Sequence, residues 1–281
     1  MQKTCTVDIE ITINSGQVFL WYKIEDQWIG VDGQDILILN QSPFRVRSSG
    51  SISNFFREDD NLEKILSNIS RDKIVRKAVK QSQGLRLIRQ DPFQCYISFI
   101  CSSNSSIQNI KSMLENLCNK FGTKQEFNGY KLHTFPKPEI LAKASIKDLI
   151  DCKLGFRAKY VKEASQAVNS CKIDFAWLKK ADYLTALENL KKILGIGNKV
   201  ADCILLFSLD KMEAFPIDRW TQRILLKYYK KDFDYITEKP MTEKKYEKLH
   251  EEIVKYFGPY AGYSQQFLFK MERDLNKKNW L

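Results

Sequence analysis

The sequence predicts an α+β fold, with an N-terminal antiparallel β-sheet and flanking helices followed by an all-helical part. Two observations indicate this. Short apolar runs separated by turn residues fill the first fifty residues. From Asp60 nearly to the end, apolar residues recur at helical spacing instead. We therefore assign residues 1–83 to the sheet domain and 84–281 to the helical domain.

The N-terminal part contains five candidate strands. In the first, apolar residues alternate with polar ones, as expected of a strand with one buried face: Cys5, Val7, Ile9, Ile11 and Ile13. Four shorter candidates follow at 18–24, 28–31, 36–39 and 44–47. Turn residues at 26–27 and 32–33 separate them. We expect these segments to form the antiparallel sheet.

Two helices of the second part can be bounded directly. Asp91 and Pro92 are typical of an N-cap and the first residue of a buried helix. A second helix is predicted by one apolar face, which Gly122 would close: Ile107, Ile110, Leu114, Leu117 and Phe121. We see no repeat or long linker that would separate the two parts into independent units.

Residues 194–198, with the sequence LGIGN, join two further helices, because apolar residues recur at helical spacing on both sides. Gly195 and Gly197 permit positive φ and the close approach of another backbone, while Ile196 can turn into the core. The free N–H groups at the start of the second helix suit a phosphate. An ordinary corner between helices, with glycine at its C-cap, explains these glycines equally well.

Lys199 lies in the first turn of the second helix, and Asp218 follows after the helix has ended. A neutral lysine amine can attack an electrophilic sugar carbon, and a carboxylate can stabilise the positive charge that develops there. This pair suits cleavage of a glycosidic bond. Alternatively, Lys199 only touches a phosphate and Asp218 only caps the next helix.

Composition narrows the class of partner. The net charge is +11 and the pI about 9.2, which favours a polyanion. We see neither a signal peptide nor an apolar run long enough to span a membrane. Seven cysteines without a CxxC pair indicate reduced intracellular thiols and argue against an iron–sulfur cluster. With two histidines, a histidine-based zinc site is not expected.

The motifs around the hairpin resemble those of the helix-hairpin-helix DNA glycosylases, and within them the 8-oxoguanine DNA glycosylase/AP lyases. The matching segments run in the family's order over nearly the whole chain: SGQVFLW (15–21), GLRLIRQDPFQCYISFICSSN (84–104), KLGFRAKYV (153–161), LGIGNKVADC (194–203), FPID (215–218) and FGPYAGYSQQFLF (257–269). The resemblance implies a TBP-like N-terminal sheet and a helical catalytic domain of the HhH-GPD type.

The resemblance also implies an activity, which is excision of 8-oxoguanine from duplex DNA in base excision repair. Lys199 would attack C1′ and form a Schiff base, and Asp218 would stabilise the charge on the sugar. β-Elimination would then nick the strand. No cofactor is needed. As in hairpins of this family, backbone carbonyls of Lys191, Ile193 and Ile196 would hold a structural cation.

The family's base pocket maps onto six positions. Gly16 would offer its carbonyl to the N7–H that distinguishes 8-oxoguanine from guanine, and Gln265 would read the Watson–Crick edge. Cys203 and Phe269 would stack on the two faces of the base. Phe207, in place of a methionine, and Pro216 would complete the lining. Without the resemblance, Gly16 is a turn glycine, and Cys203 and Phe269 are ordinary core residues.

Six positions are expected to contact DNA. Phe156, where tyrosine is more usual, and Arg157 would fill or flank the gap that the flipped base leaves, and Asn104 would occupy it. Gly195 and Gly197 would bind phosphate. Trp220 stands where a histidine contacts phosphate. From the residues alone, Phe156 is a core aromatic and Arg157 a phosphate contact.

The expected partner is duplex DNA with 8-oxoguanine opposite cytosine, bound by a single chain located with the cell's DNA, in the nucleoid, cytoplasm or nucleus. Asn109 replaces the arginine that commonly reads this cytosine, so strong preference for cytosine does not carry over. Glu272 replaces an aspartate near the pocket rim. Two other functions stay open: a non-catalytic hairpin protein that binds DNA, and a related glycosylase for another damaged base.

Overall fold

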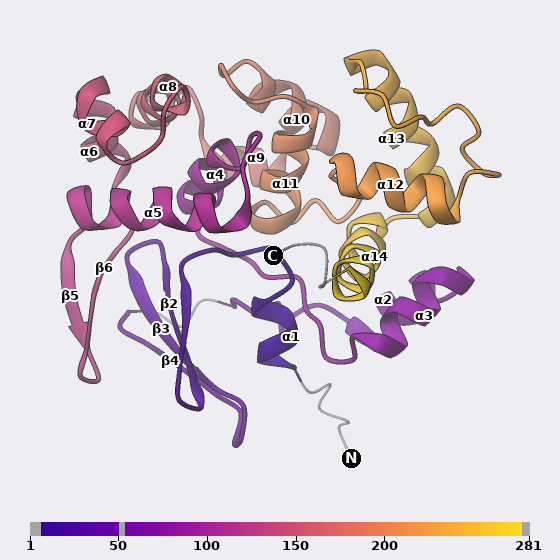
Figure 1. Cartoon of the computed structure of the whole chain (residues 1–281), viewed down its shortest axis with the longest axis horizontal. Helices are drawn as coiled ribbons and strands as arrows, with labels where there is room; N and C mark the ends of the chain where they lie inside the picture. The colour runs from indigo at the N-terminus through magenta and orange to yellow at the C-terminus, as the bar shows by residue number, and fades with distance from the viewer. Residues whose placement is uncertain (1–6, 51–53, 277–281) are drawn as a thin grey trace.

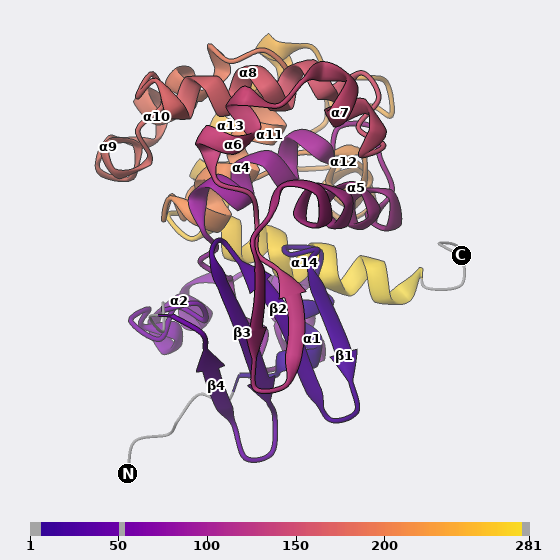
Figure 2. The ribbon, with the colours of Figure 1, turned by 90° about the vertical axis from the view of Figure 1, so that its left-hand side faces the viewer.

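The computed structural model describes residues 7–50 and 54–276 and confirms the predicted α+β class. The sheet occupies one end of the molecule and most helices gather at the other (Figures 1 and 2). The last helix, α14 (Ala261–Leu275), lies between these helices and the N-terminal pair α2 (Leu62–Ile69) and α3 (Lys73–Gln81) (Figure 1). The last helix is therefore packed against helices of the N-terminal part.

The predicted sheet is present and antiparallel throughout, in the order β1-β2-β3-β4. Its strands are β1 (Trp21–Ile24), β2 (Gln27–Asp32), β3 (Asp35–Asn40) and β4 (Arg45–Ser48). In the central register Trp28 lies opposite Lys23 on one side and Leu39 on the other. These strands correspond to the four shorter candidate segments.

The first candidate strand is wrong. Cys5 and Thr6 lie outside the described residues, and the rest of the segment forms the short helix α1 (Ile9–Ile13). The Asp8 carboxylate caps this helix by accepting the N–H of Ile11 at 2.7 Å. Ile9, Thr12 and Ile13 are the buried residues, which is a helical spacing. The alternating isoleucines therefore did not decide the structure of this segment.

The helical part also contains a β-hairpin that the sequence pattern did not predict. β5 (Lys124–Phe127) pairs with β6 (Tyr130–His133) through a turn at Asn128 and Gly129, both with positive φ. Phe127, Tyr130 and Leu132 pack against Ile29, Ile36 and Ile38, one apolar face of the sheet. Figure 2 shows this hairpin in front of β2 and β3. It therefore covers a face that would otherwise be exposed.

The two helices bounded from the sequence are confirmed. Asp91 caps α4 (Pro92–Cys101) and accepts the N–H of Gln94 at 2.8 Å. α5 (Ile107–Phe121) ends at Gly122. The other helices of this part are α6 (Pro138–Lys143), α7 (Ile146–Asp151), α8 (Arg157–Asn169), α9 (Phe175–Lys180), α10 (Tyr183–Lys191), α11 (Asn198–Ser208), α12 (Arg219–Tyr228) and α13 (Glu243–Phe257).

The main hydrophobic core continues from Val31 of the sheet into the helices, and two smaller clusters contain the other buried hydrophobic residues of the sheet. It includes Phe19 and Leu20 before β1, Leu62 of α2, and most of α4 and α11. Apolar burial on this scale stabilises the arrangement of all these elements together. Among the described residues, no helix is both long and apolar enough to cross a membrane.

Candidate active site

The predicted helix-hairpin-helix is formed by α10, α11 and the turn between them. Ile196 is buried as expected, with 5% of its surface exposed. Gly195 has a φ of +88°, and a Cβ there would lie 2.6 Å from the ring of Tyr160. Only glycine fits this position, because both the backbone conformation and the tyrosine exclude a side chain.

Gly197 differs from the expectation of positive φ. Its φ is −97°, and it is the N-cap of α11. A Cβ at this position would meet nothing within 4 Å. The space beside the start of α11 is therefore open.

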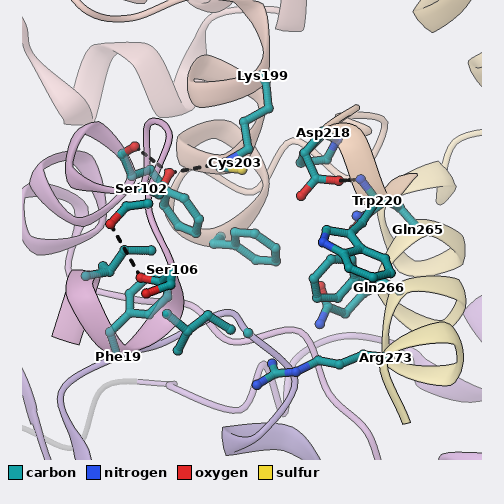
Figure 3. A pocket seen from close by; sticks show the side chains of 18 of the residues that line it. Phe19, Ser102, Ser106, Lys199, Cys203, Asp218, Trp220, Gln265, Gln266 and Arg273 are labelled. Atoms are coloured by element: carbon teal, nitrogen blue, oxygen red, sulfur yellow. Dashed lines mark hydrogen bonds between the residues drawn. The ribbon is translucent and has the colours of Figure 1, made fainter. Parts of the chain in front are cut away.

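A cavity of about 560 Å³ lies between α4, the start of α5, α11, α12, α14 and the segment before β1 (Figure 3). Eight of the predicted site residues line it: Gly16, Lys199, Cys203, Phe207, Pro216, Asp218, Gln265 and Phe269. Trp220, predicted as a DNA contact, also lines it. Segments separated by more than two hundred residues thus meet at one space, whose walls are largely aromatic and aliphatic.

Lys199 projects from the first turn of α11 into this cavity (Figure 3). Its Nζ donates to the Ser102 Oγ at 3.1 Å and lies 5.6 Å from the centroid of the Phe99 ring. The Cys203 thiol, one helical turn further on, is also beside the amine. Burial raises the pKa of this thiol to about 12, although the nearby Lys199 ammonium opposes the shift. Cys203 is therefore a neutral wall of the cavity at physiological pH.

Asp218 begins α12 and faces the cavity from the side opposite Ser102 (Figure 3). Its Oδ1 accepts the N–H of Trp220 at 3.0 Å and of Thr221 at 2.8 Å. The alternative that Asp218 is a helix cap is therefore correct, but it does not exclude a chemical role. Capping fixes one oxygen and aims the carboxylate at the cavity.

Gly16 is held where its backbone meets the ring of Phe269. Its φ is +85°, and a Cβ would lie 3.2 Å from Phe269 Cε1 and 3.1 Å from Arg273 Nη1. Gln266 Nε2 donates to the carbonyl of Ser15 at 2.8 Å, and Gln90 Nε2 donates to that of Gln17 at 3.0 Å. Hydrogen bonds to both neighbours thus fix the peptide groups around Gly16.

Gln265 has one end of its amide tied to the protein. Its Nε2 donates to Thr221 Oγ1 at 3.2 Å, which leaves its Oε1 without a partner in the described part of the chain. This oxygen is buried, and the side chain lines the cavity. A buried carbonyl oxygen without a donor is costly, so a bound group with an N–H at this point would be stabilised.

The predicted DNA contacts Asn104, Phe156 and Arg157 are not among the residues that line the cavity. Phe156 is 56% exposed, so the interpretation of it as a core aromatic is wrong. Arg157 is buried instead, and its guanidinium donates to the carbonyls of Ser103 and Asn104, with Nη2 at 3.0 Å from the latter. In this structure Arg157 therefore supports the loop that carries Asn104, rather than facing a phosphate.

Several residues of the cavity were not singled out from the sequence. They are Phe19, Phe99, Ser102, Ser105, Ser106, Gln108, Gln266 and Arg273. Apart from the matching segments in which some of them lie, they carry no spacing signal, because aromatic and serine residues are common in any core helix or loop. Their position depends on how distant segments pack.

The described residues contain no group of three or more histidine, cysteine, aspartate or glutamate side chains that could hold an ion. The expected hairpin cation would be bound by backbone carbonyls instead. The carbonyl of Ile193 accepts the N–H of Ile196 at 3.1 Å and keeps a second lone pair. The cation stays a prediction.

Comparison with protein families agrees with this architecture. Residues 97–254, which hold the hairpin, match the HhH-GPD superfamily of base excision DNA repair proteins, and the fold and cavity define a protein of that class. Residues 2–96 match the N-terminal domain of 8-oxoguanine DNA glycosylase. The chain thus belongs to the 8-oxoguanine DNA glycosylases of the HhH-GPD superfamily, a family of bifunctional DNA N-glycosylases and AP lyases.

Individual relatives support the same assignment. The chain is 29% identical to the N-glycosylase/DNA lyase OGG1 of Arabidopsis thaliana, over 96% of this chain and 78% of the relative. It is 32% identical to the N-glycosylase/DNA lyase of Saccharomyces cerevisiae, over 78% and 65% of the two chains. The 8-oxoguanine glycosylase/lyase of Clostridium acetobutylicum, in complex with DNA containing cytosine opposite 8-oxoG, superposes with a TM-score of 0.86. That structure is 30% identical and covers 96% of this chain and 93% of its own.

Proposed function

We propose that this protein removes 8-oxoguanine from duplex DNA with Lys199 as the nucleophile and then nicks the strand at the abasic site. The proposal rests on one observation. Lys199 and Asp218 line the same cavity, and Gly16, Gln265 and Phe269 form other parts of its wall. The cavity thus combines a nucleophile, a carboxylate and groups that can recognise a base.

In the proposed reaction the neutral Lys199 amine forms a bond to C1′ while the bond from C1′ to the base nitrogen breaks. The base leaves with the bonding electrons and takes up a proton. The Asp218 carboxylate stabilises the positive charge on the sugar during this exchange. Opening of the sugar ring yields a Schiff base, and loss of a C2′ proton expels the 3′ phosphate.

Base selection follows from the polar groups around the cavity. 8-Oxoguanine carries a proton on N7, where guanine has a lone pair, and the carbonyl of Gly16 would accept it. A carbonyl facing the lone pair of guanine would be left unpaired, which costs about 1–3 kcal/mol. The free Oε1 of Gln265 would accept an N–H from the Watson–Crick edge. Phe269 and Cys203 would stack on the two faces of the base.

Duplex binding is supported by the surface features next to the cavity. The exposed Phe156 ring could insert into the base stack of the duplex at the position that the flipped base has vacated. Open space beside Gly197 leaves the first amides of α11 accessible to a phosphate. The net charge of +11 favours binding to DNA of any sequence.

The proposal is tested by incubating the purified protein with duplexes that each carry one lesion: 8-oxoguanine, 3-methyladenine, uracil or an abasic site. Base release and strand cleavage are measured separately. We expect release of 8-oxoguanine and cleavage at both the 8-oxoguanine and the abasic duplex. Release of 3-methyladenine or uracil instead would assign another glycosylase activity. Binding without release would indicate a non-catalytic hairpin protein.

A further inference from the structure

A buried polar cluster lies behind the cavity and is separate from its lining. We call it the Asp202 cluster, and it consists of Asp202, Tyr183, Tyr246 and His250. Asp202 has no exposed surface, and the other three are at least nine-tenths buried. None of the four is among the residues that line the cavity.

The Asp202 carboxylate joins three helices. Its Oδ1 accepts the hydroxyl of Tyr183 from α10 at 2.6 Å, and its Oδ2 accepts the hydroxyl of Tyr246 from α13 at 2.5 Å. His250, also on α13, stacks on the Tyr183 ring at a centroid distance of 4.8 Å. Burial raises the pKa of the Asp202 carboxyl, and the hydrogen bonds from the two tyrosine hydroxyls oppose this shift. Such a buried group is tolerated only with these partners.

The cluster also holds the chain segment that leads to Asp218. The N–H of Ile217 donates to the Tyr246 hydroxyl at 3.0 Å, and the N–H of Phe215 donates to His250 Nε2 at 3.2 Å. The Tyr246 hydroxyl thus accepts from this segment and donates to Asp202. Asp218 follows Ile217 directly in the chain.

Asp202 lies on α11 less than one turn after Lys199. The same carboxylate is therefore fixed to the helix of the proposed nucleophile and, through the Tyr246 hydroxyl, to the segment that carries the proposed stabilising carboxylate. A shift of one support relative to the other would change the distance between Lys199 and Asp218. Errors of about 1 Å in such geometry can cost about a hundredfold in rate.

We propose that Tyr246, anchored by Asp202, is a positioning residue that fixes the Phe215–Ile217 backbone so that Asp218 faces Lys199. This inference rests on the proposed roles of Lys199 and Asp218. Tyr183 supports the carboxylate from the far side and reaches the segment only through His250, whose Nε2 lies 3.0 Å from the Tyr183 hydroxyl. Tyr246 therefore has a larger effect on the site than any other hydroxyl of the cluster.

The test compares Tyr246→Phe with Tyr229→Phe. Tyr229 is a matched control, because it is 1% exposed and its hydroxyl also donates to a carboxylate, that of Asp72, at 2.8 Å. Both variants lose a buried hydroxyl, but only Tyr246→Phe leaves the N–H of Ile217 without its partner. Three quantities are measured at equal folded fraction: single-turnover release of 8-oxoguanine, borohydride trapping on preformed abasic DNA, and hydrogen exchange of residues 215–218.

For Tyr246→Phe we expect base release to fall about tenfold. Trapping on abasic DNA should fall less than about twofold, because the open sugar aldehyde reacts with Lys199 without help from Asp218. Exchange of residues 215–218 should be faster than in Tyr229→Phe. Equal base release and equal exchange in the two variants would overturn the inference. If the wild type releases no 8-oxoguanine, the proposed function fails, and the exchange rates alone decide whether Tyr246 fixes the segment.

Discussion

The Nζ of Lys199 lies 3.1 Å from the Oγ of Ser102, so the proposed nucleophile is tied to the C-cap residue of α4. The Ser102 hydroxyl in turn donates to the carbonyl of Phe99 at 2.7 Å, which leaves its lone pairs for the lysine. This contact fixes where the amine lies in the empty cavity, close to the Phe99 ring.

Ser102→Ala removes this contact, and we expect base release to slow by about three- to tenfold, because the Lys199 amine loses the hydrogen bond that fixes its position in the cavity. Affinity for the damaged duplex should not change. Single-turnover kinetics and binding titrations measure the two quantities. Ser105→Ala is the control, since Ser105 lines the same cavity without a hydrogen bond to Lys199. Equal rates for both variants would show that the contact has no role in the reaction.

Asp218→Asn separates the chemical role of Asp218 from its capping role. The amide oxygen can still accept the N–H groups of Trp220 and Thr221, so the melting temperature should stay nearly unchanged. Base release should fall by about 10²–10³-fold, because the negative charge beside the sugar is lost. Asp218→Ala should have the same rate defect and, in addition, lose about 1 kcal/mol of stability with the cap. Near wild-type activity in Asp218→Asn would contradict the proposed role.

Gly16→Ala tests the close approach of the Gly16 backbone to Phe269. The variant should be less stable by about 1–2 kcal/mol, because φ is +85°. The preference of the variant for the 8-oxoguanine duplex over undamaged DNA should also fall about tenfold, because the new Cβ displaces the Phe269 ring. Gly129→Ala is the control: its φ is +83°, but nothing lies within 4 Å of the added Cβ. If both variants keep the preference, Gly16 does not read the base.

Asn109 bears on the base opposite the lesion. It lies exposed in the first turn of α5, where its backbone N–H donates to Ser106 Oγ at 3.2 Å. With an asparagine in place of the family's arginine, we expect base release opposite each of the four bases to agree within about tenfold. Asn109→Arg should raise the rate opposite cytosine selectively. Strong cytosine preference in the wild type would mean that another residue reads the opposite base.

The sequence predicted the fold class, four of the strands and the start of α4, because these depend on local patterns. The segment 9–13 was misassigned for a physical reason. Its alternating isoleucines suit a strand, but the Asp8 cap and burial of Ile9 and Ile13 against the sheet favour one helical turn. The β5–β6 hairpin could have been found from Asn128-Gly129, a dipeptide that favours two-residue hairpin turns.

Lys199 and Asp218 could be predicted because both lie in one continuous segment with the hairpin. The proposed base pocket could be predicted only through the resemblance, since Gly16 and Gln265 are far apart in the chain and neither has a local signal. Ser102, Gln266 and the Asp202 cluster could not be predicted. Their roles depend on contacts between helices that only the folded chain brings together.

Lys199 as the nucleophile is the central claim, and covalent trapping tests it most directly. The protein is incubated with borohydride and a duplex that contains 8-oxoguanine, and the covalent protein–DNA adduct is measured. The wild type should form the adduct, because borohydride reduces a Schiff base to a stable amine. Lys199→Gln should form none while it still binds the duplex. An adduct with Lys199→Gln, or no adduct with a wild-type protein that binds this DNA, would contradict the account.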